Sequence, residues 1–342
     1  MVAGFVADNL FFGRIDLWET QIVFASYAVI CFITIPLLHW FEARAVGEQS
    51  FSYWRMTLPI VMQFALGGFW SGFVIFYGRS ASLGASWPFL LFLFLVFIGS
   101  EYFHRYHSRL VFTSVLFFFA LYSYAIFVVP IYIGTVGTST FLLSGALAVG
   151  VFALFTLFLR MLARELFLND VRRIQIGALA VLVLMNVFYF SNILPPLPLS
   201  EEAAGVYHSV WRIPGAYMAT DEAGHSWRVR YLGLAPTLHV VPGESISAYS
   251  SVFAPTKLMT TIVHRWQWYD PMQKTWITKA IITYPIVGGR DGGYRGYSTV
   301  PVSDAGEWRV NIETAEGRLI TRLPFTVVIG TTPPDTNTVI LK

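Results

Sequence analysis

The chain has 342 residues, of which 55% are hydrophobic and only 13% charged, and its formal net charge is +3. This composition excludes an ordinary soluble domain, and the near balance of acids and bases gives no signal for nucleic-acid binding. The single cysteine, Cys31, has no partner, which excludes an intrachain disulfide framework and a cysteine-based zinc site.

Six apolar stretches occupy the first 194 residues. A helix needs roughly 20 apolar residues to cross the hydrocarbon core of a bilayer, and each stretch reaches or approaches that length. Tryptophan and tyrosine flank the first three stretches, as expected at the membrane interface. The sequence predicts six membrane spans, the third being the shortest: Thr20–Trp40, Thr57–Gly78, Trp87–Phe103, Leu110–Ile133, Ser139–Leu159 and Ile174–Leu194.

Arginines are distributed unequally between the two sets of predicted loops. The loops after spans one, three and five hold eight arginines, whereas the opposite set holds only Arg14 and Arg79. Because short basic loops stay in the cytoplasm, we expect a multi-pass protein of the bacterial inner membrane with both termini in the periplasm. The eight arginines are Arg44, Arg55, Arg105, Arg109, Arg160, Arg164, Arg172 and Arg173.

The end of the third span carries the sharpest local motif, Glu101-Tyr-Phe-His104-Arg-Tyr-His107. A carboxylate and two imidazoles at this spacing share one helix face, where His39 can join them to hold iron or zinc. A di-iron bundle, however, requires two Glu-x-x-His copies and further carboxylates. An ion pair between Glu101 and Arg105 at a helix end explains the same residues. We therefore favour no metal and no cofactor, and keep a membrane-embedded metal-dependent enzyme as the alternative.

Ionisable residues are scarce inside the predicted spans, which hold neutral polar groups such as Gln63 and Asn186. Transporters of small molecules use intramembrane charges and matching broken helices in two halves, and neither feature is visible. A transporter is therefore the third hypothesis.

The proline cluster at Pro195–Pro198 separates the apolar half from a segment with period-two alternation. Such alternation, with turns about every ten residues, is typical of an all-β sandwich or barrel. The predicted fold is a membrane all-α six-helix bundle followed by an all-β immunoglobulin-like sandwich domain. The predicted boundaries are 1–194 for the spans, 195–204 for a Pro-rich linker, 205–330 for the β-domain and 331–342 for a loose tail.

Four motifs recur in order in the second half: His264-Arg265-Trp266, Tyr294-Arg295-Gly296-Tyr297-Ser298, Gly306-Glu307-Trp308-Arg309-Val310 and Glu316-Gly317-Arg318. With them, Val240–Val328 resembles a bacterial domain family of unknown function. The resemblance implies a β-rich, C-terminal domain of the kind often attached to membrane segments. It does not extend to the six spans, and it implies no catalytic activity.

Aromatic and arginine residues of these motifs form a candidate binding surface, because guanidinium groups and rings can grip a sugar, a peptide or an anionic group. Its members are His264, Arg265, Trp266, Tyr294, Arg295, Tyr297, Trp308 and Arg309. The alternative is that the tryptophans fill the core and the arginines tie strands to acids. His264 is expected to be a half-buried histidine with satisfied hydrogen bonds, and Ser298 has no visible His/Asp pair that would make it a nucleophile.

No complete catalytic set appears, so the sequence favours a protein that is not an enzyme. The predicted role is an accessory or scaffold protein in the lipid bilayer. Its periplasmic β-domain would bind another envelope or membrane protein, or a glycan.

Overall fold

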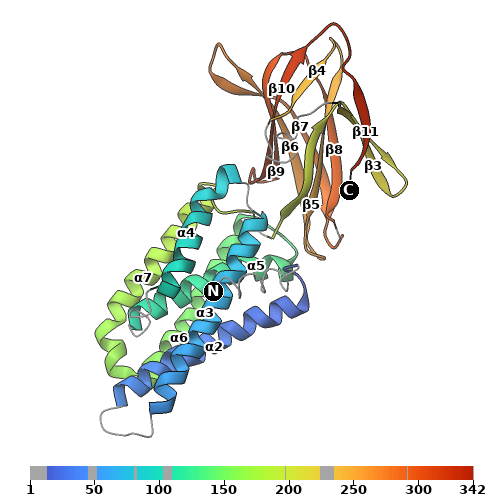
Figure 1. The fold of residues 1–342 in the computed structure, drawn as a ribbon. Helices are drawn as coiled ribbons and strands as arrows, with labels where there is room; N and C mark the ends of the chain where they lie inside the picture. The colour runs from blue at the N-terminus through green and yellow to red at the C-terminus, as the bar shows by residue number, and fades with distance from the viewer. Residues whose placement is uncertain are drawn as a thin grey trace. The chain divides into compact units, whose positions relative to one another are not determined.

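The computed structural model describes residues 14–44, 52–80, 83–102, 110–196, 198–223, 235–290 and 292–341. The chain divides into two compact units between Pro198 and Leu199, the first helical and the second built of strands. The division falls within the proline-rich segment, where the apolar runs end. The predicted fold class, a six-helix half followed by a β-rich half, is therefore confirmed (Figure 1).

Six helices make up the described part of the first unit. Five of them are long and apolar enough to cross a membrane, whereas the third contributes a shorter apolar helix, Ser86–Gly99. This matches the sequence, in which the third apolar stretch is also the shortest. The helices are α2 (Trp18–Arg44), α3 (Ser52–Ser80), α4 (Leu83–Tyr102), α5 (Leu110–Ile133), α6 (Thr138–Leu162) and α7 (Arg164–Phe190).

Helix α5 forms the centre of the helical unit and is buried along most of its length. Its phenylalanines stack on neighbours from different helices: the ring centroid of Phe117 lies 5.0 Å from that of Phe155 on α6, and Phe119 lies 5.2 Å from Trp70 on α3. A helix that is apolar on all sides is buried when it has partners on every face. Helix α7, in contrast, buries only Phe167, Ile174, Met185 and Tyr189 and lies at the periphery.

The segment predicted as a loop between spans five and six is helical. Helix α6 continues to Leu162, only Ala163 interrupts it, and α7 begins at Arg164, ten residues before the predicted span. The segment contains no Gly or Pro and is rich in Arg and Leu, which favour helix even outside the hydrocarbon. Its arginines therefore project from helix surfaces.

Eleven strands form the described part of the second unit. They are β1 (Ser200–Tyr207), β2 (Ser209–Ile213), β3 (Ala216–Glu222), β4 (Thr237–Val240), β5 (Ser245–Phe253), β6 (Met259–Asp270), β7 (Thr275–Val287), β8 (Tyr294–Pro301), β9 (Gly306–Thr314), β10 (Leu319–Ile329) and β11 (Thr336–Leu341).

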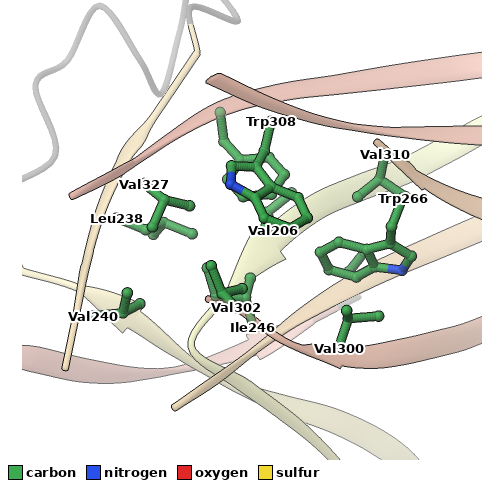
Figure 2. Packing of buried hydrophobic residues seen from close by; sticks show 12 residues of the cluster. Val206, Leu238, Val240, Ile246, Trp266, Val300, Val302, Trp308, Val310 and Val327 are labelled. Atoms are coloured by element: carbon green, nitrogen blue, oxygen red, sulfur yellow. The ribbon is translucent and has the colours of Figure 1, made fainter. Parts of the chain in front are cut away.

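Two sheets of these strands share one core, which makes this unit a β-sandwich. One sheet has the order β4-β10-β9-β6-β7 and the other β1-β5-β8; β4 pairs with β10 in parallel and the remaining pairs are antiparallel. Alternate residues of both sheets meet between them, as period-two patterning requires. Figure 2 shows this core, with Trp266, Trp308 and Val310 from one sheet facing Ile246 and Val300 from the other.

A third sheet, β11-β3-β2, packs on residues of the β1-β5-β8 sheet through Val210, Ala219, Tyr249 and Leu341. It contains β11, which lies in the segment expected to be a loose tail. Val339 and Leu341 of this strand contribute to the cluster, and burial of these side chains orders the segment. The expected linker is likewise shorter than 195–204, because Ser200 already begins β1 and pairs with Phe253.

Candidate functional site

Two of the candidate binding residues, Trp266 and Trp308, lie in the core of the sandwich. Both side chains are fully buried and pack against Phe325 of β10. Each indole N–H is satisfied, that of Trp266 by Ser298 Oγ at 2.9 Å and that of Trp308 by the Asp304 carbonyl at 2.8 Å. Large rings of this kind contribute chiefly by burial. The structure thus places both tryptophans where they hold the two sheets together.

His264 of β6 belongs to a buried polar cluster with Ser298, Ser250 and Tyr284. Its Nδ1 lies 2.8 Å from Ser298 Oγ, and its Nε2 lies 2.9 Å from Ser250 Oγ and 3.2 Å from the Tyr284 hydroxyl. The expected half-buried ring is in fact completely buried, and burial lowers the pKa of His264 to about 4. The imidazole is therefore neutral at physiological pH and links β5, β6, β7 and β8.

Ser298 does contact a histidine, although no sequence pattern indicates the pairing. The contact joins β8 to β6, which belong to different sheets, so only the three-dimensional packing brings the two side chains together. Ser298 is buried, and its Oγ also accepts the indole N–H of Trp266. A nucleophile must reach its substrate, and this hydroxyl is enclosed by core residues. We interpret the pair as a structural hydrogen bond.

Arg265 and Arg309 lie on the side of the five-stranded sheet that faces away from the core, together with Arg322. The strand register puts Arg265 of β6 and Arg322 of β10 on either side of Asn311 of β9, with Arg309 two residues before Asn311 on the same strand face. We call these three arginines the arginine face. Arg322 is the member that the sequence motifs missed, although the alternation of β10 already directs it away from the core.

Each guanidinium of the arginine face is held at Nε by a neighbouring acceptor. Arg265 pairs with Glu313 at 3.0 Å, Arg309 donates to Gln267 at 2.8 Å, and Arg322 donates to the Asn311 side chain at 2.8 Å. The Gln267 side chain also accepts from Asn311 at 3.3 Å, which connects the groups into one network. A hydrogen bond at Nε fixes the orientation of the planar guanidinium group. Its two terminal Nη atoms can then make paired hydrogen bonds to a carboxylate or phosphate.

The arginine face has an excess of positive charge. Among the described residues, Arg309 and Arg322 each donate a side-chain hydrogen bond through Nε, which leaves their Nη atoms available. Burial, and next the charge of Arg322, lower the pKa of Arg309, against the opposing effect of Glu313. Arg309 also stacks at 4.0 Å over the ring of Trp276, which limits its motion. The arrangement is suited to holding an anionic group.

Tyr294, Arg295 and Tyr297 lie on β8, in the other sheet, and form a second group. Tyr297 is 41% exposed and its ring contacts Tyr217 of β3, whose hydroxyl donates to the Arg295 carbonyl at 3.3 Å. Burial raises the pKa of Tyr249, and the nearby charge of Arg295 opposes that shift. The Nε of Arg295 is buried without a hydrogen-bond partner in the described residues. The predicted surface is thus divided between two sheets.

The candidate metal ligands can be placed only in part. Glu101 lies near the end of helix α4, and only its backbone is described. His104 and His107 lie outside the described residues. His39 is buried on α2, where Nδ1 lies 2.9 Å from Glu42 and Nε2 lies 3.4 Å from the Thr113 hydroxyl. Among the described residues, no three His, Cys, Asp or Glu side chains gather as a metal site. The iron or zinc hypothesis therefore stays a prediction.

Fold and site together define a protein with a membrane-type helical half and a β-sandwich that carries an arginine-rich face. Residues 259–327 match a family described as "Protein of unknown function (DUF2914)", which confirms the resemblance seen in the sequence motifs. The matched segment runs from β6 into β10 and includes the whole arginine face. No curated protein matches the sequence.

Proposed function

We propose that this chain is an accessory protein of the bacterial inner membrane that docks an acidic segment of another envelope protein on its arginine face. The arginine asymmetry between the spans supports a periplasmic position for the sandwich. The strand orders of its two sheets are compatible with an immunoglobulin-like domain, a class that commonly serves recognition. The family of the matched segment brings no activity that would favour an enzyme.

The observation that carries this proposal is the preorganised set of guanidinium groups on β6, β9 and β10. Their Nε atoms are fixed by Glu313, Gln267 and Asn311, so little side-chain entropy is lost when an anion binds. Arginine is also enriched among the residues that dominate protein interfaces. An acidic partner segment supplies the carboxylates that match this surface.

Site-specific cross-linking in living cells tests the proposal. A photo-reactive amino acid at Thr278, whose hydroxyl accepts a hydrogen bond from Gln267, should capture the partner. The same amino acid at Thr299, on the other sheet, should not. Combining the Thr278 probe with Arg309→Gln and Arg322→Gln should lower the cross-linked yield at least tenfold, because two charge-assisted contacts are lost. The cross-linked peptide should be acidic.

The matched control removes two exposed arginines elsewhere, Arg212→Gln and Arg290→Gln, and should leave the yield unchanged. A yield that does not change in the arginine-face variant, or a cross-linked peptide without acidic residues, would refute the proposal. If thermal stability collapses in that variant, the arginines are structural and the docking role is lost as well.

A second candidate, glycan binding, is favoured by the group on β8. The exposed ring of Tyr297 offers a surface on which a sugar can stack, and the partly exposed Arg295 side chain lies two residues before it on the same strand. Binding of soluble peptidoglycan fragments to the full chain in detergent tests it. Tyr297→Ala should abolish that binding, and equal binding by the variant rejects this candidate.

A further inference from the structure

An apolar groove of about 360 Å³ runs along the periphery of the helical unit, between α6 and α7. Phe118 of α5 contributes to its lining, Val149 and Phe152 line it from α6, and Phe167 and Leu182 line it from α7. Of its two polar lining residues, Thr156 donates its hydroxyl to the carbonyl of Ala153 at 2.8 Å. The wall of the groove is therefore mostly hydrocarbon and suits an apolar ligand.

Two arginines stand at the end of the groove where the helices join. On α6, Arg160 follows Val149, Ala153 and Thr156 at helical spacings of four, three and four residues, so it shares their face. On α7, Arg164 lies seven residues before Val171 and shares the face of the groove in the same way. Both side chains are exposed, and neither has an ion pair or hydrogen bond within residues 110–196.

The other charges of this hairpin end do not neutralise Arg160 and Arg164. Residues 160–173 hold four arginines against Glu165 and Asp170. Asp170 pairs with Arg173 at 3.0 Å, three residues away on α7. Arg173 is about 200° around the helix from Val171, on the face opposite the groove. A net positive charge is therefore concentrated at the groove entrance.

The length of the groove corresponds to one leaflet of a bilayer. From Phe167 to Leu182, helix α7 rises about 22 Å, and one leaflet including its headgroup region is about 20–22 Å thick. An acyl chain entering beside the arginines would reach the bilayer midplane at the far end of the groove. A phosphate attached to that chain would lie at the level of Arg160 and Arg164.

We propose that this groove is a specific site for an anionic phospholipid, with an acyl chain along α6 and α7 and the phosphate held between Arg160 and Arg164. Guanidinium groups bind phosphate through paired hydrogen bonds, and basic pockets between spans recognise acidic headgroups. The groove supplies length and hydrophobicity, which every phospholipid can use. The two arginines supply selectivity for negative charge.

Native mass spectrometry of the full chain in detergent, titrated with phosphatidylglycerol or phosphatidylcholine, tests the site. Phosphatidylglycerol should bind more tightly than phosphatidylcholine. Arg160→Gln with Arg164→Gln should weaken phosphatidylglycerol binding by roughly 25-fold, at about a factor of five per arginine. Phosphatidylcholine binding should weaken much less, because the choline cation already compensates the charge of its phosphate. The control, Arg173→Gln with Arg172→Gln, removes the same charge outside the groove and should change the binding by less than threefold.

A second variant fills the groove and leaves both arginines in place. Ala178→Phe places a ring among the lining residues and should reduce retention of both lipids, while the helical content of the protein stays unchanged. Equal affinity for the two lipids in the wild-type protein overturns the proposal. Equal losses in the groove and control arginine pairs also overturn it, since they would reflect unspecific attraction to net charge.

Discussion

Single residues in the sandwich show how burial decides chemistry. His264 and Arg309 stand in similar aromatic and basic motifs, yet one is enclosed and neutral while the other lies on the sheet surface and keeps its charge. Alternation along a strand separates the two faces, and it correctly groups His264 with Trp266. It does not reveal which acceptors meet a buried ring, because Ser250 and Ser298 come from the other sheet.

The neutral state of His264 predicts a pH-dependent stability. Because burial lowers the pKa of His264 from 6.5 to about 4, the unfolded chain takes up a proton between these pH values and the folded chain does not. The free energy of unfolding should fall by up to about 3 kcal/mol as the pH drops from 6.5 to 4. Hydrogen exchange of peptides from β6 and β8 measures this change in the full chain. In His264→Gln the decline should be smaller, and an identical decline would show that other groups cause it.

Secondary-structure elements were predictable where composition alone determines them. Six apolar runs gave six helices, and the span expected over Leu110–Ile133 coincides with α5 because the hydrophobic run ends where the helix ends. Helix α7 extended further than expected, since helix propensity continues beyond the apolar residues. Strand β11 was missed because its order depends on partners, chiefly β3, that are more than a hundred residues away.

Strand β11 gives a test at this scale. Leu341 is buried in a cluster with Val210, Ala219 and Tyr249, so Leu341→Ala should lower the stability of the third sheet by about 2 kcal/mol, the lower end of such losses. Exchange of the β3 amides should become faster, whereas that of β9 should not change. The exposed neighbour Ile340 provides the control, and Ile340→Ala should have little effect. Equal exchange in both variants would mean that the segment contributes no packing energy.

At the scale of the whole molecule, the distribution of arginines predicts the orientation in the membrane. Eight arginines in one set of loops against two in the other predict that both termini are periplasmic. Alkaline phosphatase folds only in an oxidising compartment, so a fusion at the C-terminus should be active, and a fluorescent cytoplasmic reporter fused there should stay dark. The reverse pair of results would place the sandwich in the cytoplasm and remove the envelope partner proposed for it.

The candidate surface was predicted in its chemistry but not in its geometry. The motifs identified Arg265 and Arg309, yet the sequence could not show that Tyr297 belongs to another sheet, because strand order is a long-range property. Arg322 joined the site only through the pairing of β10 with β9, where a register shift follows Leu319.

Strand β7 has one further consequence. It forms an edge of the five-stranded sheet, and a long free edge is a template for joining another copy of the same chain. Lys279 lies at a bulge opposite Trp266 and Gln267, and Pro285 removes one backbone donor. In a chain whose apolar helices cross a bilayer, copies of the sandwich are crowded in two dimensions, which favours such joining. The bulge and the proline oppose sheet-to-sheet aggregation where crowding is greatest.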